Sequence, residues 1–216
     1  MFKAVIFDMD GVLADSEPLY LEAINRVLAL QEVHLAQEEN EAIIGTTVEG
    51  TWQWLMAHFN LPHTRDFWIA QYDSAVLQIL KEKVTPSLGL YHLLEELKRR
   101  ALRLAVASSS RGEWIDAVLS TLKIKGEFQA IVSAEMVERG KPHPDIFLMA
   151  AKKLNTPPHQ CIVMEDSPRG IEAAKRAGMT AIALLTLYTR HLDLSRADRV
   201  IESLADFDYG ILDSGL

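Results

Sequence analysis

Residues 4–11 read Ala-Val-Ile-Phe-Asp-Met-Asp-Gly: four apolar residues, then two aspartates around a methionine, then a glycine. A short apolar run bounded by such residues is typical of a strand buried on both faces of a parallel sheet. Ligands bind beyond the carboxyl ends of such strands, where Asp8 and Asp10 lie. Side chains alternate along an extended chain, so both carboxylates project to one side. The run predicts a first strand with an acidic site at its end.

Further apolar runs predict a parallel sheet. They are Leu104–Ala107, Ala130–Val132, Ile162–Met164, Ala181–Leu184 and Arg199–Ile201. Apolar residues at helical spacing separate several of them, as in residues 90–97 and 115–122. Strands that alternate with helices indicate an α/β fold, here an open, doubly wound parallel sheet with right-handed crossovers.

One long interval carries no strand pattern. Residues 15–84 contain only helical stripes, and some seventy residues are too long for an ordinary connection between two strands. Pro86 stops the preceding helix and marks the return. We therefore expect two domains: residues 1–14 with 85–216 form the α/β core, and residues 15–84 form an inserted helical cap.

Composition excludes several classes of protein. The 216 residues carry a formal net charge of -8, which would repel nucleic acid. No apolar stretch reaches the ~18 residues of a membrane span. The N-terminus reads as a strand and not as a signal peptide, and the one cysteine, Cys161, excludes an intrachain disulfide. We expect a cytoplasmic monomer with no nucleic-acid or membrane partner.

A second acidic pair, Glu165-Asp166, follows the apolar run 161–164. Parallel strands would bring this pair to the same sheet edge as Asp8 and Asp10, and clustered carboxylates suit Mg²⁺. A capping interpretation stays open, because Asp166 or Ser167 before a proline is also an ordinary helix N-terminus.

Hydroxyl groups and one lysine complete the candidate site. Three serines, residues 108–110, end the strand at 104–107, and Ser110 with Glu113 predicts a capping box. A helix N-terminus beside hydroxyl groups is a natural phosphate seat. Lys141 lies in a loop shaped by glycine and prolines, which favours a positioned ammonium over a solvated surface charge.

Four segments in this order resemble the haloacid dehalogenase-like superfamily, in particular its small phosphatases and phosphomutases with a helical cap. They are Asp8–Leu13, Leu104–Ser108, Lys141-Pro142 and Glu165–Ser167. The resemblance spans essentially the whole chain and implies a Rossmann-like core and a phosphotransferase.

The resemblance also implies the roles of the site residues. Asp8 would attack phosphorus and become an aspartyl phosphate, while Asp10 would move the protons. Mg²⁺ would be held by the Asp8 carboxylate, the Asp10 carbonyl and Asp166, with Glu165 binding it directly or through water. The residues implied to bind phosphate oxygens are Ser108, Ser109 and Lys141.

The cap favours hydrolysis over isomerisation. β-Phosphoglucomutases hold a second phosphate with basic residues on the cap, whereas the turn at residues 45–50 carries no basic residue. We therefore expect a Mg²⁺-dependent phosphatase acting on a small sugar phosphate or similar metabolite. The candidate specificity residues are Glu17, Tyr20, Thr46, Thr47, Val48 and Glu49.

Three alternatives to a phosphatase stay open. A β-phosphoglucomutase-type mutase is the first. A receiver-like signalling module would also use acidic residues, a hydroxyl and a lysine around a phosphorylated aspartate, but it has no use for a substrate lid. A binding protein without catalysis is disfavoured, because every role has a chemically suitable residue.

Overall fold

The computed structural model describes residues 1–36, 39, 43 and 47–214. The chain folds into two compact units. One, the core unit, comprises Met1–Asp15 and Thr85–Leu216, and the other, the helical unit, is Ser16–Val84. Thr46 lies outside the described residues. In the described part of the chain, no helix combines the length and the apolar character that a bilayer crossing requires.

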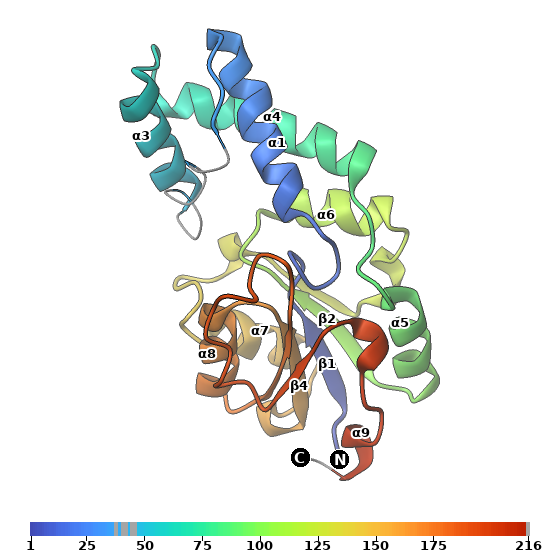
Figure 1. Cartoon of the computed structure of the whole chain (residues 1–216). Helices are drawn as coiled ribbons and strands as arrows, with labels where there is room; N and C mark the ends of the chain where they lie inside the picture. Colours follow the sequence, from blue (N-terminus) through green and yellow to red (C-terminus); the bar gives the residue numbers. More distant parts are fainter. Residues whose placement is uncertain (37–38, 40–42, 44–46, 215–216) are drawn as a thin grey trace. The chain divides into compact units, whose positions relative to one another are not determined.

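The core unit is built on a six-stranded, wholly parallel sheet (Figure 1). Its strands are β1 (Ala4–Phe7), β2 (Arg103–Ala107), β3 (Ala130–Val132), β4 (Cys161–Glu165), β5 (Thr180–Leu184) and β6 (Arg199–Ile201). The six predicted strands are confirmed, with ends that differ by one residue at most. They are ordered β3-β2-β1-β4-β5-β6, which is the doubly wound arrangement.

Helices cover the sheet on both faces. In the core unit they are α5 (Leu90–Arg99), α6 (Gly112–Thr121), α7 (Asp145–Lys153), α8 (Pro168–Arg176) and α9 (Ile211–Ser214). Short 3-10 turns lie at Lys125–Glu127, Ala134–Met136, Pro158–Gln160 and Leu204–Asp206. Ala4 and Ile6 of β1 share a buried cluster with Phe147 of α7 and Ile171 of α8. Figure 1 shows α7 and α8 on one side of the sheet and α5 on the other.

The helical unit is held together by an aromatic core. Its helices are α1 (Glu17–Leu28), α3 (Val48–Phe59) and α4 (Arg65–Lys83), with a 3-10 turn at Ala29–Gln31. Trp52 of α3 and Trp68 of α4 are fully buried and stack with ring centroids 5.9 Å apart. Tyr72, one turn along α4, packs on Trp52. Large aromatic rings stabilise a small unit efficiently, because each buries much apolar surface.

The strand order decides where a site can form. β1 lies between β2 and β4, and Phe7 at its end pairs with Val106 and Met164. From β1 the strand order runs outward through β2 on one side and through β4 and β5 on the other. The connections on the two sides therefore run in opposite directions, which opens a crevice beyond the carboxyl ends of β1 and its neighbours. The residues that follow β1 and β2, and those that end and follow β4, therefore meet at one edge.

Candidate active site

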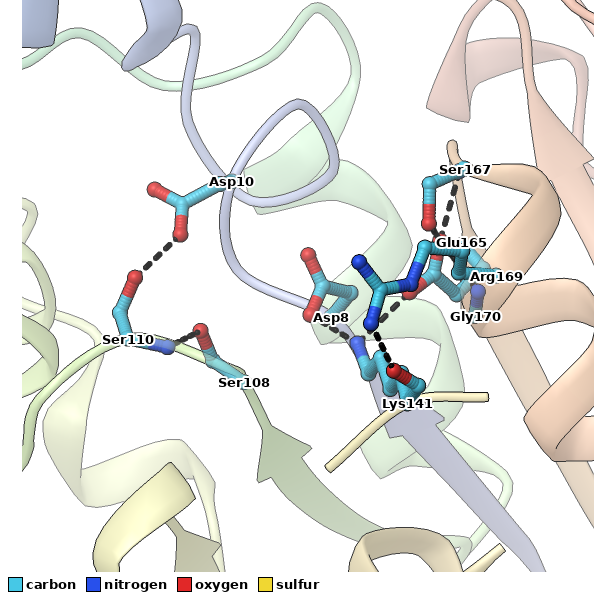
Figure 2. A network of polar contacts seen from close by, with 9 residues as sticks. All are labelled: Asp8, Asp10, Ser108, Ser110, Lys141, Glu165, Ser167, Arg169 and Gly170. Atoms are coloured by element: carbon cyan, nitrogen blue, oxygen red, sulfur yellow. Dashed lines mark hydrogen bonds and ion pairs between the residues drawn. The ribbon is translucent and has the colours of Figure 1, made fainter. Parts of the chain in front are cut away.

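A buried row of three charges lies at this edge of the core unit. The Lys141 ammonium donates to Oδ1 of Asp8 at 2.5 Å and to Oε1 of Glu165 at 2.6 Å (Figure 2). Exposed fractions are 6% for Asp8, 7% for Lys141 and 1% for Glu165. The Asp8 N–H donates to the Met164 carbonyl at 2.9 Å, which extends the ladder between β1 and β4 by one residue. Asp8 is thus fixed by the sheet itself.

The environment of this row shifts two pKa values. Burial raises the pKa of Asp8 to about 7, because desolvation outweighs the lowering effect of the Lys141 ammonium, and Glu165 and Asp10 add to the rise. Burial alone would lower the pKa of Lys141, but the Asp8 and Glu165 carboxylates outweigh burial and hold that pKa above its ordinary value. Lys141 therefore keeps its charge, and its ammonium limits the rise in the pKa of Asp8.

Glu165 is held on both of its oxygens. Oε1 accepts from Lys141, and Oε2 accepts from the Ser167 N–H at 2.7 Å and the Ser167 hydroxyl at 2.9 Å. A Cβ at Gly170 would lie 1.7 Å from Oε1, so only glycine leaves room for this carboxylate. The capping interpretation also holds: Ser167 is the N-cap of α8 and accepts from the Gly170 N–H. This arrangement suits Glu165 to positioning Lys141.

Asp10 is held from the opposite direction by a serine. The Ser110 hydroxyl donates to Oδ2 of Asp10 at 2.6 Å, and the Ser110 N–H donates to Oγ of Ser108 at 3.0 Å (Figure 2). Ser108 is fully buried, and because its oxygen accepts from Ser110, its own proton can go to an anion. Ser109, predicted to bind phosphate, has an exposed side chain.

The predicted capping box of Ser110 with Glu113 is wrong. The N-cap of α6 is Arg111, without a side-chain capping bond, and the helix begins at Gly112. A distant carboxylate serves this helix end instead, because Oε2 of Glu135 accepts from the Gly112 N–H at 3.0 Å. The start of α6 thus already holds an anion from the chain itself, so this N–H is not open to a phosphate.

The oxygen groups at this edge fit a hard cation held partly by water. Asp166 is buried, and its Oδ2 would lie 2.2 Å from a Cβ at Gly11, so the carboxylate packs against the loop that carries Asp8 and Asp10. In the described chain, Lys141 is the only hydrogen-bond donor to the Asp8 side chain, and it binds one oxygen of the two. Mg²⁺ takes one or two carboxylates and keeps several waters. Nowhere in residues 1–36, 39, 43 and 47–214 do three acidic, histidine or cysteine side chains gather closely enough to hold a metal by themselves.

The predicted specificity residues lie in the helical unit. Glu17 and Tyr20 belong to the first turns of α1. Thr47 is the N-cap of α3, where its hydroxyl accepts from the Gly50 N–H at 3.1 Å, and Val48 and Glu49 open that helix. The hydroxyl of Thr47 is thus engaged in capping.

Two contacts were not foreseen from the sequence. Ser110 was assigned to a capping box, although its hydroxyl binds Asp10. Arg169 had no assigned role, but its guanidinium donates to the Lys141 carbonyl at 2.7 Å. The spacing of Ser110 from the strand end was a usable signal, since it follows β2 as closely as Asp10 follows β1. No local pattern marks Arg169.

Comparisons with known proteins bear on the family and the fold of this chain. A family model described as haloacid dehalogenase-like hydrolase matches residues 5–184. A phosphorylated carbohydrates phosphatase of Thermotoga maritima is 32% identical over 180 residues, covering 83% of each chain. A beta-phosphoglucomutase of Bacillus subtilis is 32% identical over 189 residues, covering 84% of this chain and 83% of that one. The crystal structure of CbbY from Rhodobacter sphaeroides in complex with phosphate superposes with a TM-score of 0.86 at 29% identity, covering 95% and 96% of the two chains.

Proposed function

This chain belongs to the haloacid dehalogenase-like hydrolases and is a phosphoric monoester hydrolase, and we propose that it hydrolyses a small sugar phosphate in a Mg²⁺-dependent reaction through a phosphorylated Asp8. One observation carries the proposal. The buried Asp8 carboxylate at the end of β1 has an ammonium on one oxygen, while the second aspartate of the run, Asp10, is bonded separately by Ser110. Two carboxylates in different surroundings are suited to two different tasks.

In the first half-reaction, Asp8 attacks phosphorus. A bond forms between its carboxylate oxygen and phosphorus, and the bond from phosphorus to the sugar oxygen breaks. Asp10 donates its proton to the departing sugar oxygen, which leaves as an alcohol. The hydrogen bond from Ser110 orients the Asp10 side chain for this transfer.

In the second half-reaction, water attacks the phosphorus of phosphorylated Asp8. Asp10, now ionised, takes a proton from that water as the bond from phosphorus to Asp8 breaks, and inorganic phosphate leaves. Asp8 is regenerated as a carboxylate and Asp10 as an acid. Lys141 and the Ser108 hydroxyl bind phosphate oxygens in both half-reactions. The Lys141 ammonium thereby offsets the repulsion between the negatively charged phosphate and this acidic chain.

A magnesium ion would be held by the carboxylates of Asp8 and Asp166 and by the Asp10 carbonyl. When bound, it would neutralise charge on the phosphoryl group as that group moves between oxygens. Glu165 takes the supporting role in this proposal, because both of its oxygens already accept hydrogen bonds from Lys141 and Ser167.

The helical unit is proposed as the cap that selects the substrate, with Glu17, Tyr20 and Thr46 to Glu49 as candidate contacts. The carbohydrate phosphatase among the relatives supports a sugar phosphate as substrate class. The relative named beta-phosphoglucomutase supports a second candidate function, phosphomutase activity. Hydrolysis is preferred because Thr47, Val48 and Glu49 offer no cation for a second phosphate.

Phosphate release from a panel of sugar monophosphates and p-nitrophenyl phosphate, with Mg²⁺ and with chelator, tests the phosphatase. We expect turnover with at least one sugar phosphate, loss of it in chelator, and loss of it in Asp8→Asn. Undiminished turnover by Asp8→Asn would remove Asp8 as the nucleophile. The mutase arm supplies β-glucose 1-phosphate with a bisphosphate primer, and conversion to the 6-phosphate without phosphate release would replace hydrolysis by isomerisation.

A further inference from the structure

We propose that Arg169 is a positioning residue that anchors the main chain of Lys141, so that the ammonium keeps its place when Asp8 changes its bonding. The inference rests on the proposed function, in which Lys141 binds phosphate oxygens. In the described part of the chain, no hydrogen bond or ion pair joins Arg169 to Asp8 or to Glu165, the other carboxylate of the buried row. Its effect on the reaction therefore passes through Lys141.

The contact is direct and well shaped. Nη2 of Arg169 donates to the Lys141 carbonyl at 2.7 Å, and Figure 2 shows the guanidinium reaching toward Lys141 from the chain that follows Glu165. A charged donor this close to a carbonyl makes one of the stronger protein hydrogen bonds. Lys141 is therefore held at both ends: Arg169 binds its carbonyl, and Asp8 and Glu165 bind its ammonium.

The two anchors come from one rigid element. Arg169 is the second residue of α8, whose N-cap, Ser167, donates to Glu165 through both its N–H and its hydroxyl. The helix start thus fixes the carboxylate that binds the ammonium and also the guanidinium that binds the carbonyl. A displacement of α8 would move both ends of Lys141 together.

A main-chain anchor matters because the ammonium exchanges partners during the reaction. When Asp8 carries a phosphoryl group, its charged carboxylate is no longer there to hold Lys141. Glu165 and the phosphoryl oxygens then hold the tip of a side chain with four rotatable bonds, and on an unfixed main chain this tip would lose its orientation while it exchanges partners. The Arg169 hydrogen bond does not involve the reacting atoms, so it persists through both half-reactions.

Arg176 offers a matched control on the same helix. Its Nη1 donates to the next carbonyl, Pro142, at 3.3 Å, and its side chain is half exposed. It carries the same charge, donates to the same loop and makes a longer hydrogen bond to a carbonyl that has no link to the ammonium. A general requirement for arginine on α8 would affect both positions, whereas anchoring of Lys141 affects Arg169 alone.

The test measures inorganic phosphate binding by calorimetry with Mg²⁺ present, and kcat and KM with p-nitrophenyl phosphate. We expect Arg169→Ala to weaken phosphate binding and to lower kcat/KM, each by about tenfold. Arg169→Lys, which keeps a charged donor, should recover most of the loss, and Arg176→Ala should stay within about twofold of wild type. Melting temperature is recorded for each variant.

A double-mutant cycle that combines Arg169→Ala with Lys141→Ala separates the proposed role of Arg169 from the proposed role of Lys141. If Lys141→Ala weakens phosphate binding and Arg169→Ala adds nothing in that background, Arg169 acts through Lys141, as proposed. Equal losses in both backgrounds, or a lower melting temperature in Arg169→Ala without a change in phosphate binding or kcat/KM, would overturn the Arg169 inference alone. If Lys141→Ala leaves phosphate binding unchanged, the proposed role of Lys141 fails and the inference fails with it. Should Arg169→Ala not fold, Arg169→Gln takes its place in the cycle.

Discussion

Gly170→Ala should disable the site without touching any reacting group. An alanine Cβ at this position would lie 1.7 Å from Oε1 and 1.9 Å from Cδ of Glu165, far inside any real contact distance. Glu165 cannot shift and keep its partners, because Lys141 holds one oxygen and Ser167 holds the other. The carboxylate must leave, and Lys141 then loses one of its two anions.

The magnitude follows from the bonds that are lost. Separating a buried ion pair costs about 3–5 kcal/mol. Inside a helix, alanine returns about 1 kcal/mol relative to glycine. The expected net loss is about 2–4 kcal/mol of unfolding free energy, which lowers the melting temperature of a chain of this size by about 4–16 °C. We also expect kcat to fall by at least about tenfold, because Lys141 is no longer aimed at the phosphate.

Thermal and urea denaturation measure the stability loss, and phosphate release measures the activity. Gly126→Ala is the control, because no described atom lies within 4 Å of a Cβ there, and its cost should stay within about 0.5 kcal/mol. In a Glu165→Ala background, Gly170→Ala should cost nothing further, since the space is then empty. Wild-type melting temperature and turnover in Gly170→Ala would refute the reasoning.

Three further changes test other parts of the site. Burial raises the pKa of Asp8 from 3.8 to about 7, so between these pH values the folded metal-free protein keeps a proton that the unfolded chain has released. The free energy of unfolding should therefore fall as the pH rises from about 4 to 7. Denaturation curves of Asp8→Asn should lack this pH dependence. Ser110→Ala removes the hydrogen bond to Asp10 and should lower kcat by about threefold to tenfold in steady-state assays, whereas the exposed Ser109→Ala should leave kcat unchanged. Glu135→Gln removes the negative charge at the start of α6 and should lower the free energy of unfolding by about 0.5–1 kcal/mol while turnover is retained. An unchanged midpoint in urea denaturation would contradict the capping role of Glu135.

Most of the strands were predictable because they are short apolar runs that are largely buried, and such runs leave a strong local signal. The edge strand β6 is the exception, since Arg199 and Val200 are exposed. Their spatial order was not local information: which strand pairs with β1 depends on contacts between residues about 100 or more positions apart, as between Phe7 and Val106. The resemblance to a known superfamily, and not periodicity, supplied the roles of Asp8 and Asp10.

The wrong capping box at α6 and the missing prediction for Arg169 have the same physical cause. A capping box is a local sequence pattern, and Ser110 with Glu113 matches it in residue type and spacing. Glu135, 23 positions from Gly112, takes the helix end instead. Arg169 likewise acts on a carbonyl 28 positions away. Local patterns cannot report such competition between near and distant partners.

The distant cap on α6 ties local folding to the composition of a separate loop. Glu135 accepts from the N–H at the start of α6, while the Ser110 hydroxyl donates to Asp10. A serine oxygen can accept a hydrogen bond while its proton is donated elsewhere, as Ser167 does between Gly170 and Glu165. A related chain without an acid at position 135 should therefore lose helix stability and keep the Ser110 hydrogen bond to Asp10, so substitutions in this surface loop should affect folding before they affect catalysis.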